Sequence, residues 1–312
     1  MSINKIDLAT IKRVTADKSS VNEHKSDISI WFDRLKQIDA QQKAETAKNT
    51  DSVIYATKQS KKTADCWLLS GLNALNATEF GRKAISEALE VSPNGDRVIT
   101  LKGLNNRQIK ITKAELDAAK ASGLYADGDL NVIAFELAFE KIKNEEHPRT
   151  ALEKEMNGLA INWGESNELF YLISGRKCST SSRDQNLGKN PRYVDNTRLD
   201  VAGTLDMLAE NPDSVAMVCS FSMSNGLGKY TIDGVEVSPR HAYAIVGVEK
   251  DDNGVEYVLL KNPNDSSKTL RISKQSLLKN VNSVDALPRE GVELPVKENA
   301  FDKIDIDKLL KK

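Results

Sequence analysis

A cysteine stands where a polar loop meets an apolar segment, in the stretch TADCWLL over residues 63–69. Asp65 is a plausible N-cap for a helix over the following apolar residues, whose spacing predicts one buried face. The N–H groups of a first helical turn favour the thiolate, which is the form of cysteine that attacks carbonyl carbon. Cys66 is therefore the candidate nucleophile, and a buried structural cysteine is the alternative.

A nucleophilic cysteine needs a base, and the chain has three histidines. His24 and His147 lie in polar, charged stretches that predict solvated loops. His241 opens the run HAYAIVGVEK, which predicts a largely buried strand. We expect His241 to be the base, with a purely structural histidine as the alternative.

The turn DDNG at residues 251–254 predicts that the strand after His241 pairs with a second strand, which ends at Asn262 and Pro263. Such a hairpin brings Asn262 back toward His241. A side-chain amide there can orient an imidazole without adding charge. This is the role of the third residue in a triad of nucleophile, base and orienting group. The alternative is that Asn262 and Pro263 only end a strand and begin a turn.

Six segments, in their order along residues 55–290, resemble those of the calpain family of papain-like cysteine proteases. They are DCWLL (65–69), LNVIAFELAFEKI (130–142), ESNELFYLISG (165–175), VAMVCSFS (215–222), RHAYAIVGVEK (240–250) and LLKNP (259–263). The second is similar to an amphipathic helix of that family. The resemblance implies an α+β, papain-like two-lobed fold in which a helical lobe carries Cys66 and a β-rich lobe carries His241 and Asn262. It also implies cysteine endopeptidase activity in the cleft between the lobes.

The sequence departs from the family pattern close to the proposed nucleophile. The family has a glutamine six residues before the cysteine that contributes to the oxyanion hole, whereas this chain has Ser60 there and Gln59 one residue earlier. A one-residue insertion gives Gln59 that role, and an exposed loop glutamine is the alternative. Asn264 replaces the tryptophan that follows Asn–Pro in the family, so we expect His241 and Asn262 to be more open to water.

The resemblance raises the question of calcium, because calpain cores bind it through acidic loops. Residues 52–63, upstream of the cysteine, contain no carboxylate, and the downstream acidic loop is replaced by NDSSKTLRIS. Calcium takes six to eight oxygen ligands, usually several from Asp or Glu. We therefore expect an enzyme that needs neither calcium nor any other metal or cofactor.

Composition excludes several other classes of protein. The 44 basic and 45 acidic residues are interspersed and give a net charge near −1, which argues against a nucleic-acid or membrane-surface binder. The partner we expect is a protein or peptide substrate, acted on by a monomer. Three widely separated cysteines fit a reducing compartment, and no apolar run reaches the length of a membrane span or secretory core, so a cytoplasmic location is expected, leaderless export being the alternative.

The chain of 312 residues divides into four predicted regions. Residues 1–50 form a polar extension with one helical pattern at 28–48, and residues 291–312 a charged peripheral tail. The first lobe spans 51–175 and includes a hairpin of RVITLKG and RQIKIT; the second spans 176–290 and ends with a last strand and short helix in TLRISKQSLLKNV. Two other functions stay open: acyl transfer or glutamine deamidation by the same triad, and a non-catalytic binding module.

Overall fold

The computed structural model describes residues 54, 57–150, 153, 158–184, 187–222 and 228–297. The chain divides into two units, Met1–Thr50 and Asp51–Lys312, and every described residue belongs to the second. The helix expected over residues 28–48 and the tail after residue 297 lie outside the described residues.

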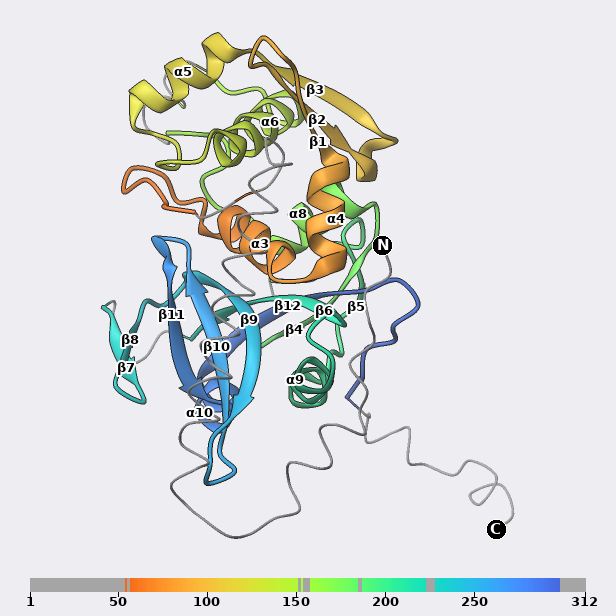
Figure 1. Ribbon diagram of the computed structural model, residues 1–312, viewed down its shortest axis with the longest axis vertical. Coiled ribbons are helices and arrows are strands. Elements are labelled where there is room, and N and C mark those ends of the chain that lie inside the picture. The colour runs from red at the N-terminus through yellow and green to blue at the C-terminus, as the bar shows by residue number, and fades with distance from the viewer. Residues whose placement is uncertain are drawn as a thin grey trace, which may run out of the picture. The chain divides into compact units, whose positions relative to one another are not determined.

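Helices and a small sheet make up the first part of the second unit, at the top of Figure 1. The helices are α3 (Cys66–Asn76), α4 (Glu79–Ala88), α5 (Lys113–Ser122), α6 (Leu130–Glu146) and α8 (Ser166–Ser174). The sheet is antiparallel and contains β1 (Leu89–Val91), β2 (Arg97–Leu101) and β3 (Arg107–Ile111). The predicted hairpin is confirmed as β2 and β3, joined through a short 3-10 turn at Lys102–Leu104.

A seven-stranded sheet makes up the rest of the described chain, in the order β11-β10-β9-β6-β12-β4-β5. Its strands are β4 (Cys178–Ser182), β5 (Val194–Asn196), β6 (Val215–Phe221), β9 (Ala242–Lys250), β10 (Glu256–Asn262), β11 (Asp265–Ser273) and β12 (Val281–Pro288). Neighbouring strands are antiparallel except β4 and β5. Helices α9 (Val201–Glu210) and α10 (Lys274–Asn280) and a hairpin of β7 (Tyr230–Ile232) and β8 (Val235–Val237) complete it. The molecule is thus α+β, as expected.

The end of the sheet differs from the prediction. The segment expected to be the last strand and helix becomes β11 and α10, but a further strand, β12, follows and lies in the interior of the sheet between β6 and β4. Its sequence VNSVDALP hides the strand because Asp285 breaks the apolar alternation. Asp285 points away from the sheet's own core and meets Asn167 of α8.

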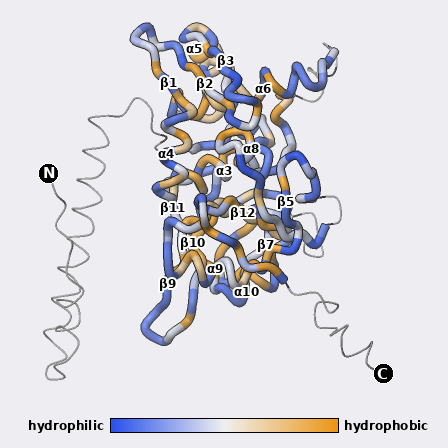
Figure 2. The backbone as a smooth tube through the Cα atoms, turned by 90° about the vertical axis from the view of Figure 1, so that its right-hand side faces the viewer, coloured by the Kyte–Doolittle hydropathy of each residue, from blue (hydrophilic) through white to orange (hydrophobic). Residues whose placement is uncertain are grey.

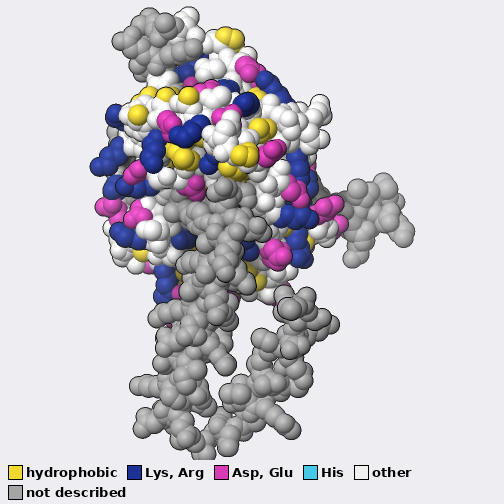
Figure 3. Space-filling model, turned by 45° about the horizontal axis from the view of Figure 1, so that its top comes forward, with side chains coloured by type: hydrophobic (Ala, Val, Ile, Leu, Met, Phe, Trp, Pro, Cys, Tyr) yellow, Lys and Arg dark blue, Asp and Glu magenta, His cyan; other side chains and the backbone are white. Residues whose placement is uncertain are grey.

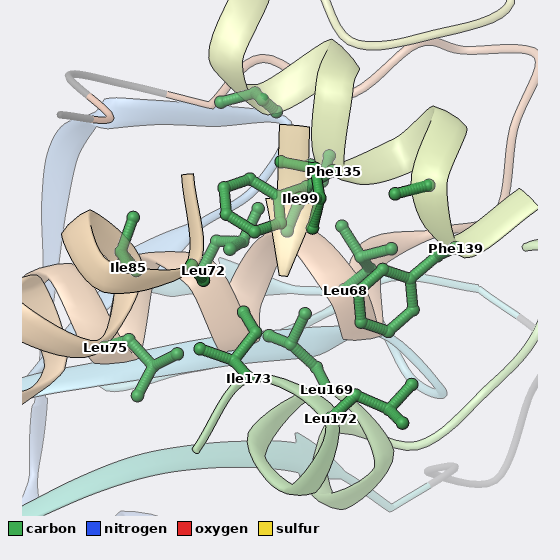
Figure 4. Close-up of a cluster of buried hydrophobic side chains, with 14 of the residues drawn as sticks. Leu68, Leu72, Leu75, Ile85, Ile99, Phe135, Phe139, Leu169, Leu172 and Ile173 are labelled. Atoms are coloured by element: carbon green, nitrogen blue, oxygen red, sulfur yellow. The ribbon is translucent and has the colours of Figure 1, made fainter. Parts of the chain in front are cut away.

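Two hydrophobic clusters form the interior. The first surrounds α3, as Figure 4 shows, with fully buried side chains from α3, α6 and α8 such as Leu68, Phe135 and Leu169. The second lies within the large sheet, around Met217 and Tyr243. Alanines at the start of β9 belong to the first cluster, so the sheet packs directly on α3.

Helix α6 departs from the amphipathic pattern expected of it. Every residue from Asn131 to Phe139 is buried, so the first half of the helix is enclosed on all sides. Glu136 is among these residues and is fully buried. A carboxyl group in the middle of a core helix requires a specific partner.

The surface carries both signs of charge. On the face shown in Figure 3, basic and acidic side chains are interspersed over the described residues, and the turn between β9 and β10 extends from the sheet as a hydrophilic loop (Figure 2). The first residues of the expected peripheral tail are held in place, because Val296 pairs with Leu199 and Pro295 accepts a hydrogen bond from Asp200. No helix among the described residues is long and apolar enough to cross a membrane.

Candidate active site

Cys66 is the first residue of helix α3 and is partly exposed. Leu68, Leu69 and Leu72 of this helix are fully buried and anchor it in the first hydrophobic cluster. Cys66, at the start of the helix, lies at the boundary of the two parts of the molecule. Ser70, one turn further on, donates a hydrogen bond of 2.9 Å to the carbonyl oxygen of Ala242 in β9. The nucleophile's helix is therefore fixed to the strand that follows His241.

The electrostatics of Cys66 differ from what its position at a helix start suggests. Its sulfur accepts hydrogen bonds from the backbone N–H groups of Cys66, Trp67 and Ala242, each of which favours the thiolate. Burial outweighs them and raises the pKa of the Cys66 thiol, and the charge of Asp65 raises it further. Asp65 is at the N-cap position, but its side chain makes no capping hydrogen bond, so the expected N-cap is wrong in this respect.

His241 and Asn262 meet as the hairpin of β9 and β10 predicts. The two strands pair in antiparallel register, with Ala244 opposite Lys261. His241 Nε2 and Asn262 Oδ1 are 2.8 Å apart. Arg240, just before His241, has a φ of 54°, so the backbone turns sharply into the strand at the histidine. The ring of Tyr243 packs edge-on against the imidazole at 5.0 Å between centroids.

A second hydrogen bond fixes which tautomer of His241 is present. The backbone N–H of Asn264 also points at Asn262 Oδ1, at 3.0 Å. Because a backbone N–H can only donate, this atom is the amide oxygen, and His241 Nε2 must donate to it. The other ring nitrogen, Nδ1, then has no proton and is free to accept one. Asn264 is exposed, and His241 and Asn262 are half-buried; that the missing tryptophan leaves these two residues more open to water stays a prediction.

Burial lowers the pKa of His241, and the hydrogen bond to Asn262 opposes this only in part. The imidazole is consequently neutral at pH 7, and the raised pKa of Cys66 keeps its thiol protonated. The resting pair is thus a thiol and a neutral imidazole. Such a pair transfers its proton as the sulfur attacks, rather than beforehand.

Gln59 lies beside Asp65, one residue before the nucleophile. Its side-chain Nε2 donates to the carbonyl oxygen of Thr63 at 2.8 Å, which uses one of its two N–H groups, and its Oε1 is buried without a partner. The structure therefore brings Gln59 to the nucleophile's loop rather than leaving it as an exposed loop residue. Its role as an oxyanion donor stays a prediction, and the Gln59 side chain also faces the carboxyl group of Asp65.

The segment containing Gln59 is bonded to the turn that follows Asn262. The N–H of Gln59 donates to the carbonyl oxygen of Pro263 at 2.8 Å. Ser266 Oγ accepts from the N–H of Thr57 at 2.7 Å and donates to its carbonyl oxygen at 3.0 Å. Asn73 of α3 reaches the same segment, through Thr57 Oγ1 at 2.7 Å. These bonds hold the loop of the nucleophile and the turn of Asn262 in one register.

The loop before α8 runs alongside the residues that flank Cys66. The N–H of Trp163 donates to the carbonyl oxygen of Ala64 at 3.0 Å, and Ala64 N–H donates to Asn162 Oδ1 at 2.7 Å. Trp67 anchors the other side by donating from its indole to Ile161 at 2.9 Å. A side chain at Gly164 would collide with the Trp67 ring, since a Cβ there would lie 2.4 Å from it.

A cavity of about 480 Å³ opens beside Cys66 between this loop and the large sheet. Its lining includes Trp163, Gly164, Arg240 and Asp285. Trp163 is 72% exposed and has a φ of 68°, so a large apolar side chain is presented to solvent at the cavity's edge. We did not predict Trp163 or Asp285 from the sequence; the available signal for Trp163 was an isolated tryptophan in the polar loop NWGES.

His24 lies outside the described residues, and His147 ends α6 in an exposed position. Within the described ranges, no three His, Cys, Asp or Glu side chains are arranged to hold a metal ion. Independence from calcium stays a prediction.

Comparison with known proteins finds similarity among solved structures but not among family models or curated proteins. No family model matches the chain, and no curated protein matches it. Among solved structures, the chain is similar to the bromelain protease from Ananas comosus in complex with the E64 inhibitor, with 14% sequence identity over 76% of this chain and 94% of that chain. The TM-score is 0.28, which is too low to establish a shared fold. What the site can do therefore depends on its own geometry.

Proposed function

We propose that this chain is a calpain-like cysteine endopeptidase with Cys66 as nucleophile, His241 as base and Asn262 as the group that orients the base. One observation carries the proposal. Asn262 Oδ1 lies 2.8 Å from His241 Nε2, while Ala242, next to His241, accepts a hydrogen bond of 2.9 Å from Ser70 of the helix that begins at Cys66. These contacts join segments separated by up to 196 residues in sequence and support their assignment as nucleophile, base and orienting group.

The proposed reaction has two steps. His241 Nδ1 takes the thiol proton as Cys66 Sγ attacks the scissile carbonyl carbon, and the oxyanion is held by the N–H of Cys66 and a side-chain N–H of Gln59. His241 then gives the proton to the leaving amine, whose bond to carbon breaks. Water, activated by the same imidazole, releases the acyl group and restores the thiol. A peptide substrate fits in the cavity beside Cys66, with Trp163 at its edge.

The two parts of the molecule support the papain-like two-lobed arrangement that we propose for it. One hydrophobic cluster surrounds the nucleophile's helix, and the other lies in the sheet that carries His241 and Asn262. The cavity lies where the two meet.

We also propose that activity needs no metal. The loop of Gln59 and the turn after Asn262 are joined by direct hydrogen bonds, so no ion is required to set their register. Cys66, Cys178 and Cys219 are free thiols, which supports a reducing compartment such as the cytoplasm.

The test is cleavage of an unfolded protein such as casein, read as new protein termini. Cys66→Ala is expected to abolish cleavage and labelling by an epoxide inhibitor of cysteine proteases, and a chelator is expected to change neither. Cys178→Ala is the matched control, because it removes a fully buried thiol that does not line the cavity. Fragments from Cys66→Ala would contradict the proposal, as would ammonia release without new termini, which would indicate the deamidase instead.

A further inference from the structure

Asp65 is a buried carboxyl group without the partners that a buried carboxylate needs. It directly precedes Cys66 and is 0% exposed. Within the described residues, neither Oδ1 nor Oδ2 has a hydrogen-bond partner in good geometry; the Gln59 side chain and the backbone N–H of Asp65 lie near enough to favour its charged form, but burial outweighs them. Its side chain does not cap α3 either. A buried carboxylate with no donor costs several kcal/mol, roughly, so something else must compensate it.

What Asp65 meets is a second carboxyl group. Glu136, in the middle of α6, is also 0% exposed, and its carboxyl group faces that of Asp65. The neighbours of the two residues are in direct contact, because Thr63 Oγ1 donates to the carbonyl oxygen of Leu124 and the Trp67 and Phe139 rings lie 5.9 Å apart between centroids. Both oxygens of Glu136 share one donor, the N–H of Ala126, at 2.9 and 3.0 Å. A hydrogen bond between two carboxyl groups requires that one of them carries a proton.

No cation compensates this pair in the described part of the chain. Lys143 of α6 and Arg149, just after that helix, are engaged elsewhere, Lys143 with Glu168 and Arg149 with Glu140. Tyr125 faces Glu136, and burial raises the pKa of its phenol, so it brings no charge. Two carboxylates in contact without a cation cannot both be ionised at neutral pH.

A third acceptor lies at the same point. Gln59 Oε1 is buried without a partner while the amide nitrogen is bonded to Thr63. Gln59 Oε1 and both oxygens of Asp65 are thus buried acceptors in the segment before Cys66, and a proton on the acid pair adds a donor there.

We propose that Asp65 and Glu136 hold a single proton between them at neutral pH, and that Glu136 is thereby a positioning residue for Cys66. Sharing the proton lets Asp65 stay buried at the start of α3, beside Gln59, while the sulfur faces one negative charge instead of two. Burial raises the pKa of both groups, most for Glu136, which agrees with retention of the proton. The shared proton does not depend on the proposed proteolysis; its role toward Cys66 rests on that proposal.

Two isoelectric variants separate this arrangement from a merely structural one. Asp65→Asn and Glu136→Gln each keep a donor between the two side chains and leave one negative charge, as does the wild type with one shared proton. They differ in where the charge lies, because Glu136→Gln puts it next to Cys66 and Asp65→Asn moves it away to α6. The pH at which Cys66 becomes reactive should therefore be lower in Asp65→Asn than in Glu136→Gln, by on the order of one pH unit, with the wild type between.

The experiment measures the rate of Cys66 alkylation by iodoacetamide against pH, in the full chain and in the two variants, which needs no protease activity. The Cys66→Ala variant gives the background from the other thiols. If the wild type were doubly ionised, both variants would lose one charge and both profiles would shift below that of the wild type, which would overturn the proposal.

Infrared spectroscopy tests the proton directly and works on the wild type even where a variant fails to fold. At pH 7 we expect a protonated-carboxyl C=O band that is sensitive to deuterium exchange and is lost in both variants. Asp285→Asn and Glu168→Gln identify bands from the other buried acids, whose pKa values burial also raises. A wild-type spectrum at pH 7 with no such band beyond those two acids would refute the shared proton.

Discussion

At the scale of single residues, Asn262 decides which nitrogen of His241 acts as the base. Its oxygen accepts from both the imidazole and the N–H of Asn264, so Nδ1 is left as the acceptor. In the proposed reaction, this nitrogen takes the proton of Cys66. The sequence indicated that Asn262 orients His241, but the second donor that fixes the tautomer is visible only in the turn.

The pH dependence of Cys66 reactivity follows from the same site. Burial raises the pKa of Cys66 and lowers that of His241, so no thiolate–imidazolium pair forms in the resting protein. The thiolate appears only as pH rises through the raised pKa, and the alkylation rate of the wild type should climb continuously above neutral pH. A plateau of high reactivity persisting below pH 6 would show a preformed ion pair.

His241→Ala is expected to lower cleavage by about 10²- to 10⁴-fold, and His147→Ala, at an exposed residue, is the control.

At the scale of elements, the site depends on backbone pairing between segments far apart in the chain. Residues 57–59 are joined to the turn at 263–266, and Asn73 joins α3 to the first of these segments through Thr57. These hydrogen bonds therefore fix the positions of a helix, a loop and a hairpin relative to one another. Loss of any one bond shifts the oxyanion donors relative to His241.

Ser266→Ala tests this coupling. The substitution leaves the N–H of Thr57 without its acceptor in a buried place, so we expect a loss of about 1–3 kcal/mol in the free energy of unfolding. The value of kcat/KM should fall by more than the loss of folding stability explains. The reason is that Gln59, the proposed oxyanion donor, is two residues from Thr57. Thermal unfolding and kcat/KM are the measurements. Ser267→Ala, at an exposed neighbour, should change neither; an active, fully stable Ser266→Ala variant would speak against the coupling.

At the scale of the whole molecule, Asp285 links the two parts. It projects from β12 toward the start of α8, where Asn167 donates to it at 3.2 Å. Burial raises its pKa to about 7, and the charge of Glu165 contributes in the same direction. The junction between the two hydrophobic clusters therefore contains a carboxyl group that titrates near neutral pH.

This acid makes stability depend on pH with a definite sign. The folded pKa is about 7 and the ordinary value 3.8, so the folded state binds the proton more strongly than the unfolded state. Its contribution to stability is greatest below about pH 4 and is lost as pH rises to about 7. Asp285→Asn should flatten this part of the profile of melting temperature against pH. Asp252→Asn, in the exposed turn after β9, is the control, and an unchanged slope in Asp285→Asn would count against the assignment.

Local patterns in the sequence were sufficient for the elements that carry the site. The helix starting at Cys66, the strand after His241 and the hairpin ending at Asn262 follow from apolar periodicity and from the turn DDNG, because these signals act between neighbours in the chain. The order of the segments also led to the α+β class and to the candidate residues Cys66, His241 and Asn262, of which the structure joins His241 and Asn262 directly.

Only the tertiary structure decided what surrounds them. Strand β12 escaped prediction because its polar Asp285 is stabilised by a distant helix terminus rather than by its own strand pattern. The thiol of Cys66 is protonated at rest because burial outweighs the helix-start N–H groups, and burial is a property of the packed molecule. The contact between Asp65 and Glu136, which are 71 residues apart, has the same origin. The two carboxyl groups can influence Cys66 together only once α3 and α6 are packed against each other.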